Sequence, residues 1–213
     1  MITVWGRSDS SATARVMWAA GEAGVSVERR DWGGDFGGND DPAFRAVSPP
    51  GRIPAITTST GFSLWESAAI IRWLASRHPQ AGLWPEDPQA RWQAEAWMDW
   101  SAAPARAVGA VRTAYRRSSP DPAEMGRSVA AAVDVLQVLE IRLAGRAFVM
   151  GRQLSVADLA LGVAVHRWFR VPPELEPPRL PALADWYARL CERPAFREHV
   201  LEKVSVRPQR VGG

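Results

Sequence analysis

A proline-rich turn that opens an apolar strand is the feature that most limits how this chain can fold. Pro49-Pro50-Gly51 forms the turn, and Pro54 directly precedes the strand-forming residues 55–58. Proline has no backbone N–H, so it sits beside a strand only where no ladder hydrogen bond is needed, and a cis bond before it would turn the chain sharply. We therefore expect the backbone groups of Ile53 to face something outside the sheet.

Strands and helices alternate through the first part of the chain. Short β-branched and aromatic runs predict strands, and an alanine-rich stretch with apolar residues at helical spacing predicts a helix between the first two strands, as a parallel pair requires. In order, the predicted elements are a strand over 2–5, a helix over 12–23, a strand over 25–32, a short helix over 42–47, strands over 55–58 and 62–64, and a helix from Ser67.

The second part of the chain predicts only helices. A linker over residues 80–88, which is rich in turn-forming residues, separates an N-terminal domain of residues 1–79 from an all-helical domain of residues 89–213. The first predicted helical segment is long, over 89–117, and Pro104 and Gly109 should bend or interrupt it. A helix with apolar residues from Val129 to Leu143 on one stripe follows, and then a helix from Ser155 to about Phe169 in which Ser155 and Asp158 form a capping box. Two final helices are predicted over 182–191 and 194–203, before a tail through Gly213 that should fray.

Charge and cysteine content exclude several classes of protein. The formal net charge of the 213 residues is +3, and the arginines are interspersed with acids, which disfavours nucleic-acid binding. Cys191 is the only cysteine, so no internal disulfide can form, and no apolar run is long enough to span a bilayer. The three histidines show no ligand spacing with Cys191, so we expect no metal site. These features predict a cytoplasmic protein that does not enter membranes.

The motifs of the chain, taken in order, resemble those of the cytosolic glutathione S-transferases over nearly its whole length. Four local matches carry the resemblance: Gly6-Arg7 followed by Ser10-Ser11 before the first helix; Pro49-Pro50-Gly51-Arg52-Ile53-Pro54, similar to Asn-Pro-x-Gly-x-Val-Pro; Trp65-Glu66-Ser67-Ala68-Ala69-Ile70, similar to Glu-Ser-x-Ala-Ile; and the late capping box from Ser155 to Asp158. The opening is most similar to a bacterial branch near the theta and phi classes. The resemblance implies a thioredoxin-like N-terminal domain followed by an all-helical domain.

The resemblance also implies a site for the tripeptide glutathione. Ile53, before Pro54, would pair its backbone with the bound peptide as an added strand. Glu66 would take the ammonium of the γ-glutamyl end, and the Ser67 hydroxyl with the helix N-terminus would receive its carboxylate. Arg52 would meet the glycyl carboxylate, because a guanidinium binds a carboxylate bidentately.

A serine before the first helix would activate the glutathione thiol by hydrogen-bonding the thiolate and lowering its pKa. Counted back from Arg15, the phi-like spacing selects Ser10 and the theta-like spacing selects Ser11; we favour Ser10. Ala12 stands where the related branch has asparagine, and Ser48 stands where the family's proline motif begins with asparagine. The candidates that the resemblance suggests for the electrophile pocket are Arg7, Phe36, Trp100, Ala103, Arg106 and Ala107.

The function implied is that of a homodimeric glutathione transferase that adds the activated thiol to small apolar electrophiles in detoxification, with glutathione as co-substrate and no metal. Two alternatives use the same fold. One is a glutathione-dependent peroxidase or isomerase. The other is a catalytically silent relative that binds glutathione or a partner without chemistry.

Overall fold

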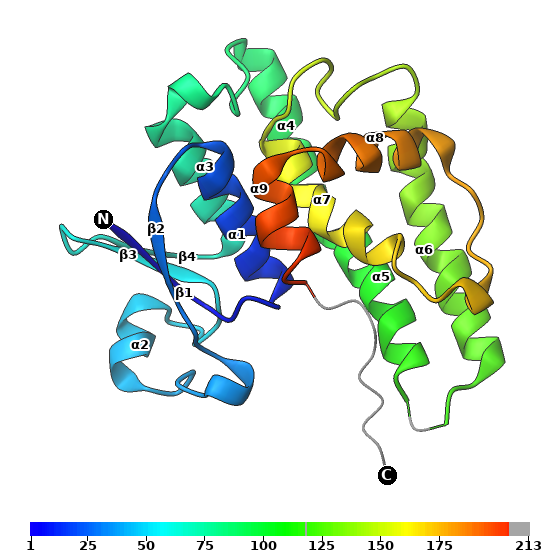
Figure 1. Ribbon diagram of the computed structural model, residues 1–213, viewed down its shortest axis with the longest axis horizontal. Coiled ribbons are helices and arrows are strands. Elements are labelled where there is room, and N and C mark those ends of the chain that lie inside the picture. Colours follow the sequence, from blue (N-terminus) through cyan, green and yellow to red (C-terminus); the bar gives the residue numbers. More distant parts are fainter. Residues whose placement is uncertain (118, 205–213) are drawn as a thin grey trace.

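The computed structural model describes residues 1–117 and 119–204, and its first seven main elements follow the predicted order of strands and helices (Figure 1). Each observed element lies within about three residues of its prediction. The strands are β1 (Ile2–Trp5), β2 (Val27–Arg30), β3 (Ala55–Thr58) and β4 (Ser63–Trp65), and the helices are α1 (Ser11–Glu22), α2 (Pro42–Val47) and α3 (Ser67–Arg77).

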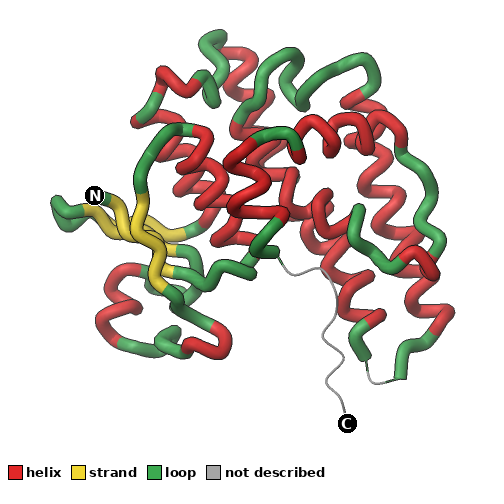
Figure 2. Tube along the Cα trace, viewed as in Figure 1, coloured by secondary structure: helices red, strands yellow, loops and turns green. Residues whose placement is uncertain are grey.

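The four strands lie together in one mixed sheet (Figure 2). Their order is β2-β1-β3-β4. β1 runs parallel to β2 and antiparallel to β3, and β3 pairs antiparallel with β4. Val4 is paired with Ile56, and both side chains are almost fully buried. Helices α1 and α3 pack against each other and against the sheet, which confirms the thioredoxin-like arrangement of the N-terminal half.

The predicted long helix over 89–117 is interrupted, but not at the predicted residues. The break lies at Ser101, between α4 (Pro88–Trp100) and α5 (Ala102–Tyr115). The Ser101 hydroxyl donates to the Met98 carbonyl at 2.6 Å, a local bond that bends helices. Pro104 falls in the first turn of α5, where its missing N–H costs little. Gly109 continues the helix without a break.

Further helices complete the second half of the chain. They are α6 (Pro122–Leu143), α7 (Val156–Trp168), α8 (Pro181–Cys191) and α9 (Pro194–Phe196), the last continued by a π-helical turn η4 (Arg197–Leu201), with short 3-10 turns at η1 (Gly34–Phe36), η2 (Pro79–Ala81) and η3 (Pro173–Leu175). Every residue of α7 except Arg167 is buried. The all-helical second half is confirmed, and the tail from residue 205 to Gly213, with its predicted fraying, lies outside the described residues.

α7 also joins the two halves of the molecule. It packs against both α1 and α3 of the N-terminal half. Gly162 allows this approach, because a Cβ placed there would lie 2.7 Å from the Trp18 ring of α1. The Arg193 guanidinium binds the Glu22 carboxylate at the end of α1 through two hydrogen bonds of 2.7 and 2.5 Å. The last turns of α1 are therefore held against the second half.

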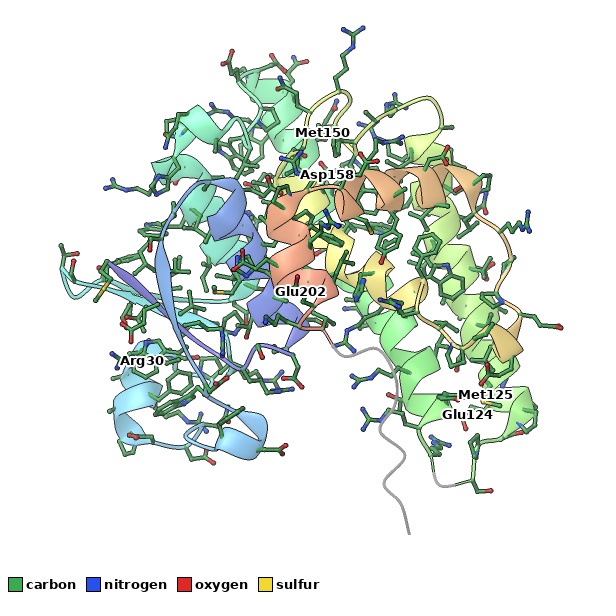
Figure 3. All side chains as sticks on the ribbon, in the orientation of Figure 1. Arg30, Glu124, Met125, Met150, Asp158 and Glu202 are labelled. Carbon is green, nitrogen blue, oxygen red and sulfur yellow. The ribbon has the colours of Figure 1, made fainter. Side chains whose placement is uncertain are left out.

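The predicted capping box of α7 is present and extends into a larger network around Asp158. Figure 3 labels Asp158 among the side chains of the molecule. The buried Asp158 carboxylate accepts hydrogen bonds from the Ser155 amide and hydroxyl at 2.9 and 2.8 Å. It also accepts from the Val149 amide and the Trp186 indole, both at 2.9 Å. Burial raises the pKa of Asp158, and these bonds oppose that shift. The carboxylate thus fixes the start of α7 to α8 and to the preceding loop.

None of the described helices is long and apolar enough to cross a membrane. Among residues 1–117 and 119–204, no group of three or more histidine, cysteine, aspartate or glutamate side chains could hold a metal ion.

Candidate functional site

A cleft of about 180 Å³ brings together all five residues predicted to contact glutathione. The proline-rich turn supplies one wall, the end of β4 with the start of α3 supplies another, and α1 closes the cleft through Ala12. The lining residues are Ala12, Arg52, Ile53, Pro54, Trp65, Glu66 and Ser67. Two segments that are separate in the sequence therefore meet at one site.

Ser48 holds the loop that carries Arg52 and Ile53. Its buried hydroxyl donates to the Arg52 carbonyl at 2.8 Å and accepts from the Arg52 amide at 3.2 Å. Gly51, with φ of 62°, is required in this turn because a Cβ would lie 2.5 Å from the Asn39 carbonyl oxygen. The serine that stands in place of the family's asparagine thus fastens the loop from inside.

The backbone of Ile53 faces away from the sheet, as predicted from Pro54. The Ile53–Pro54 bond is cis. Among the described residues, neither the amide nor the carbonyl of Ile53 makes a backbone hydrogen bond, because the ladder of β3 begins only at Ala55. An extended peptide in the cleft would find both groups free to pair with it.

Glu66 and Ser67 form the start of α3. Glu66 adopts φ of 67°, an unfavourable conformation for a residue with a side chain, and such strain concentrates at ligand-binding positions. Ser67 is the first residue of α3 and is 8% exposed. The hydroxyl lies beside the free amides of the first helical turn, a combination suited to a carboxylate.

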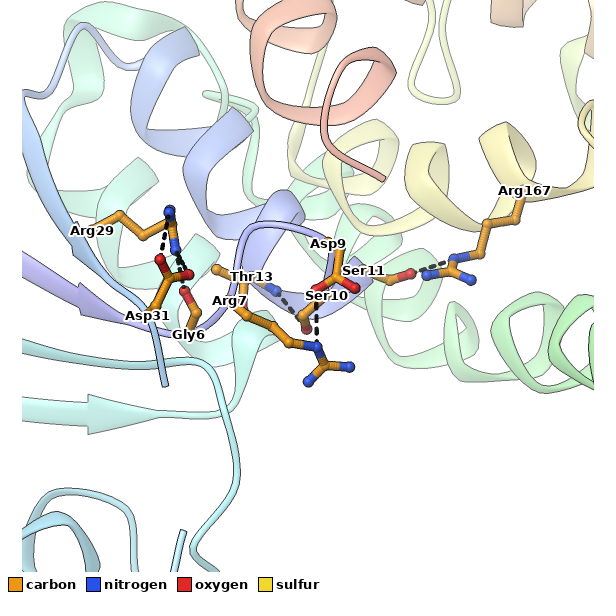
Figure 4. Close-up of polar contacts among 9 residues, drawn as sticks. All are labelled: Gly6, Arg7, Asp9, Ser10, Ser11, Thr13, Arg29, Asp31 and Arg167. Carbon is orange, nitrogen blue, oxygen red and sulfur yellow. Dashed lines mark hydrogen bonds and ion pairs between the residues drawn. The ribbon is translucent and has the colours of Figure 1, made fainter. Parts of the chain in front are cut away.

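The two candidate serines occupy different environments (Figure 4). Ser10 is the buried N-cap of α1, and its hydroxyl oxygen accepts from the Thr13 amide at 3.4 Å. That bond uses only the oxygen, so the Ser10 hydroxyl can still donate its proton to a thiolate. Ser11 instead accepts from Arg167 Nε of α7 at 2.5 Å and lines a second cavity.

The second cavity, of about 560 Å³, lies between the first turns of α1, one face of α5, and α7. On α5 the lining positions recur at three- and four-residue intervals, which is one helical face. The lining residues are Ser11, Arg15, Ala105, Val108, Gly109, Arg112, Thr113, Arg116, Arg117, Ala164 and Arg167. Burial lowers the pKa of the Arg15 and Arg167 guanidinium groups to about 10 in each case.

None of the six predicted electrophile-pocket residues lines this cavity. Arg7 pairs with Asp9 at 2.9 Å, Phe36 is 60% exposed, and Trp100 packs edge-on against Trp97. Ala103, Arg106 and Ala107 lie on α5 but not on the face that lines the cavity. Of the cavity arginines, Arg15 entered the sequence analysis only as the end of the serine spacing, and Arg112 and Arg167 had no motif to mark them. Ala105, Val108 and Arg112 do show the spacing of one helical face.

Known proteins match this chain along nearly all of its length. It matches the family model for the glutathione S-transferase N-terminal domain over residues 1–76 and a glutathione S-transferase C-terminal domain over residues 122–189. Glutathione S-transferase GstB of Escherichia coli strain K12 is 34% identical over 212 residues, covering 96% of this chain and 100% of the relative.

Two solved structures share the fold. The theta class glutathione S-transferase of the citrus canker pathogen Xanthomonas axonopodis pv. citri, with glutathione bound, matches with a TM-score of 0.86 at 35% identity, covering 96% of this chain and 99% of that one. A glutathione transferase of Burkholderia graminis, with two glutathione molecules bound per subunit, matches with a TM-score of 0.81 at 26% identity, covering 93% and 87%.

The thioredoxin-like domain, the helical domain and the cleft between the proline turn and α3 define a glutathione-binding class of protein. With these matches, the chain belongs to the glutathione S-transferase family and is a glutathione transferase.

Proposed function

We propose that glutathione binds as an extended peptide in the cleft lined by residues 52–54 and 65–67, and that Ser10 activates its thiol. The Ile53 backbone would pair with the peptide, Glu66 would hold the ammonium, and Ser67 would hold the γ-glutamyl carboxylate. Arg52 is exposed at the edge of the cleft and would meet the glycyl carboxylate. The observation that carries the proposal is that all five side chains line one cleft.

The Ser10 hydroxyl would donate to the glutathione sulfur at the N-terminus of α1. A hydroxyl donor and a helix N-terminus both stabilise a thiolate, which lowers the thiol pKa from its free value of about 8.5. The thiolate sulfur would then attack an electrophilic carbon, forming a C–S bond. The thiol proton leaves to solvent, and in a substitution the leaving group departs with its bonding electron pair.

Small electrophiles with an apolar body would occupy the second cavity. Ala105, Val108 and Ala164 supply its apolar surface. Ser11 connects the two sites, because it lines this cavity while the adjacent Ala12 lines the glutathione cleft. We propose that this conjugation serves detoxification in the cytoplasm of a bacterium, which the single cysteine and the Escherichia coli relative support.

The proposal is tested by titrating the ultraviolet absorbance of the thiolate in bound glutathione. In the wild type and in Ser11→Ala, the bound thiol should titrate about one to two pH units below free glutathione. In Ser10→Ala its pKa should return to about 8.5. If the bound thiol of the wild type titrates as in free solution, the proposed transferase mechanism is wrong. If the lowered thiol pKa is lost only in Ser11→Ala, Ser11 rather than Ser10 activates the thiol.

We further propose the two-domain division of residues 1–79 and 89–213, and a homodimer. Exposed aromatic side chains support the dimer: Trp92 of α4 is 76% exposed, and Phe62, just before β4, is 42% exposed. Trp92 shares a face of α4 with Glu95 and Asp99, which bind Arg72 of α3. Light scattering should report a dimer that Trp92→Ser weakens and Ile141→Ser, on the exposed face of α6, does not.

A further inference from the structure

The second cavity is strongly cationic. Among the described residues, eleven line the cavity; five of these are arginines, and none is an aspartate or glutamate. Three of these arginines, Arg15, Arg112 and Arg167, are half-buried and come from three different helices, α1, α5 and α7. The other two, Arg116 and Arg117, are exposed at the mouth. This composition is not what small apolar electrophiles, the substrate class that the resemblance implies, would require.

Ordinary structural roles explain only part of this cluster. Cations at the C-terminal end of a helix are favourable, which accounts for Arg116 and Arg117 at the end of α5. Arg117 also pairs with Glu124. Neither reason applies to Arg15, in the middle of α1. Two acids act on the cluster. Asp9 raises the pKa of Arg112 and Arg167 but is already paired with Arg7, and Glu66, which lines the glutathione cleft, raises the pKa of Arg15.

Buried donors in the cavity lack partners. The Nε atoms of Arg15 and Arg112 are shielded from solvent and make no hydrogen bond to any described residue. A buried unsatisfied donor is costly, and a guanidinium has the fork geometry that matches a carboxylate. Burial is the main cause that lowers the pKa of Arg15, Arg112 and Arg167, so an incoming anion would relieve an existing cost.

Gly109 keeps the cavity open. It lies in the middle of α5, where glycine is unfavourable, yet a Cβ at this position would meet nothing within 4 Å. Packing therefore does not require glycine at this position. Gly109, Ala105, Val108 and Ala164 form an apolar surface beside the guanidinium groups, which suits an organic anion rather than a small inorganic ion.

We propose that this cavity selects electrophiles that carry a carboxylate, held by Arg15, Arg112 and Arg167, with their apolar part over Ala105, Val108 and Ala164. The proposal rests on the transferase function and names its substrate class. For a chloroarene acid, the glutathione thiolate would form the C–S bond while the C–Cl bond breaks and chloride leaves with its electron pair. The carboxylate takes no part in the bond changes and anchors the molecule.

A carboxylate could also come from a second molecule of glutathione, as two bind each subunit of the Burkholderia graminis relative. The probes 4-chloro-3-nitrobenzoate and 4-chloro-3-nitrobenzamide separate these sources, because they match in shape and differ in charge. Calorimetric titration of each into protein saturated with S-methylglutathione, which has no free thiol to react with the chloroarene, measures their affinities independently of catalysis.

The acid should bind the wild type at least about 10-fold more tightly than the amide, and Arg112→Met should remove this preference. Gly109→Leu should block the acid by filling the cavity, and its matched control Gly126→Leu, at another open position on α6, should not. Arg127→Met removes a positive charge from an exposed position on α6 and controls for the loss of one charge. Equal affinities for acid and amide would overturn the inference, and so would acid binding that saturating S-methylglutathione abolishes, which would assign the cavity to a second glutathione.

Conjugation rates keep the two proposals distinguishable. Each enzymatic rate is divided by the uncatalysed rate with glutathione, because the acid and the amide differ in intrinsic reactivity. A larger acceleration for the acid, reduced about 10-fold or more in Arg112→Met, supports the inference. Acceleration of both compounds to the same extent overturns the inference and leaves the transferase function standing. Tight acid binding with no acceleration of either compound supports the anion site and contradicts the transferase mechanism.

Discussion

The glutathione cleft and the arginine cavity share the first turns of α1 but are built in different ways. The cleft comes from two short segments, 52–54 and 65–67, and offers backbone groups at Ile53 and at the start of α3. The cavity comes from the side chains of three helices and offers guanidinium groups. In our proposals, the cleft would recognise its ligand through main-chain groups, and the cavity would recognise its ligand through side chains.

The two regions also differ in how their polar groups are satisfied. Ser48 ties the loop of the cleft with two hydrogen bonds to Arg52, so the loop is fixed before a ligand arrives. In the cavity, the Nε atoms of Arg15 and Arg112 have no partner among the described residues. A fixed main chain suits a peptide that never changes, whereas unsatisfied side chains tune a site to one class of second substrate. We therefore expect substitutions in the cavity lining to change the second substrate while the glutathione cleft stays the same.

The largest expected effect disturbs α7, which both regions need. Asp158→Ala removes the acceptor of four hydrogen bonds and leaves the buried Val149 amide, Ser155 amide and Trp186 indole without it. At about 1–3 kcal/mol for each unsatisfied donor, the free energy of unfolding should fall by roughly 4 kcal/mol. Denaturant unfolding followed by tryptophan fluorescence measures this loss.

Because α7 packs against α1 and α3, Asp158→Ala should weaken glutathione binding and anion binding together. The exposed Asp134→Ala on α6 is the matched control and should change stability by less than about 0.5 kcal/mol. Loss of the anion site alone, with glutathione binding intact, would show that the two regions are independent modules.

The next effect separates the two regions. Glu66→Ala removes the carboxylate proposed to hold the glutathione ammonium, so the glutathione dissociation constant should rise about 10- to 100-fold by calorimetry. Binding of 4-chloro-3-nitrobenzoate should not weaken, because Glu66 is the acid whose charge raises the pKa of the cavity's Arg15. Glu28→Ala, which removes an exposed carboxylate from β2, should leave both affinities unchanged. An unchanged glutathione affinity in Glu66→Ala would withdraw Glu66 from the site.

The same contrast explains what the sequence could predict. The cleft depends on Pro54, on the Gly51 turn and on the helix start at Ser67. Each of these residues fixes the conformation of the main chain next to it, so its residue type alone indicates the local backbone geometry. The order of strands and helices could be predicted for the same reason. The break at Ser101 was assigned instead to Pro104 and Gly109, because the tolerance of proline in a first helical turn depends on where the helix begins.

The arginine cavity could not be predicted, because its residues meet only after α1, α5 and α7 pack. Arg15, Arg112 and Arg167 are separated by 50 residues or more along the chain, and each taken alone resembles an arginine on a solvated helix face. Helical spacing could have placed Ala105, Val108 and Arg112 on one face. It could not show that this face meets Ser11, since that contact depends on the packing of α7 against α1.

The smallest expected effect tests whether the cavity is built for binding rather than stability. Burial and the neighbouring Arg112, Arg7 and Arg116 lower the pKa of Arg167, whereas Asp9 raises it. A lowered pKa means that folding disfavours the charged form, and arginine is charged in both the folded and unfolded states at neutral pH. Arg167→Met removes that cost but also the hydrogen bond to Ser11, and solvent screening reduces the charge term. The net result should be a gain of about 1 kcal/mol in the free energy of unfolding, together with weaker binding of the nitrobenzoate.

Arg117→Met, which breaks a pair with Glu124, should give no such gain in the free energy of unfolding. A stability loss in Arg167→Met would mean that the arginine serves the fold, and the contrast between the two regions would then lose its basis.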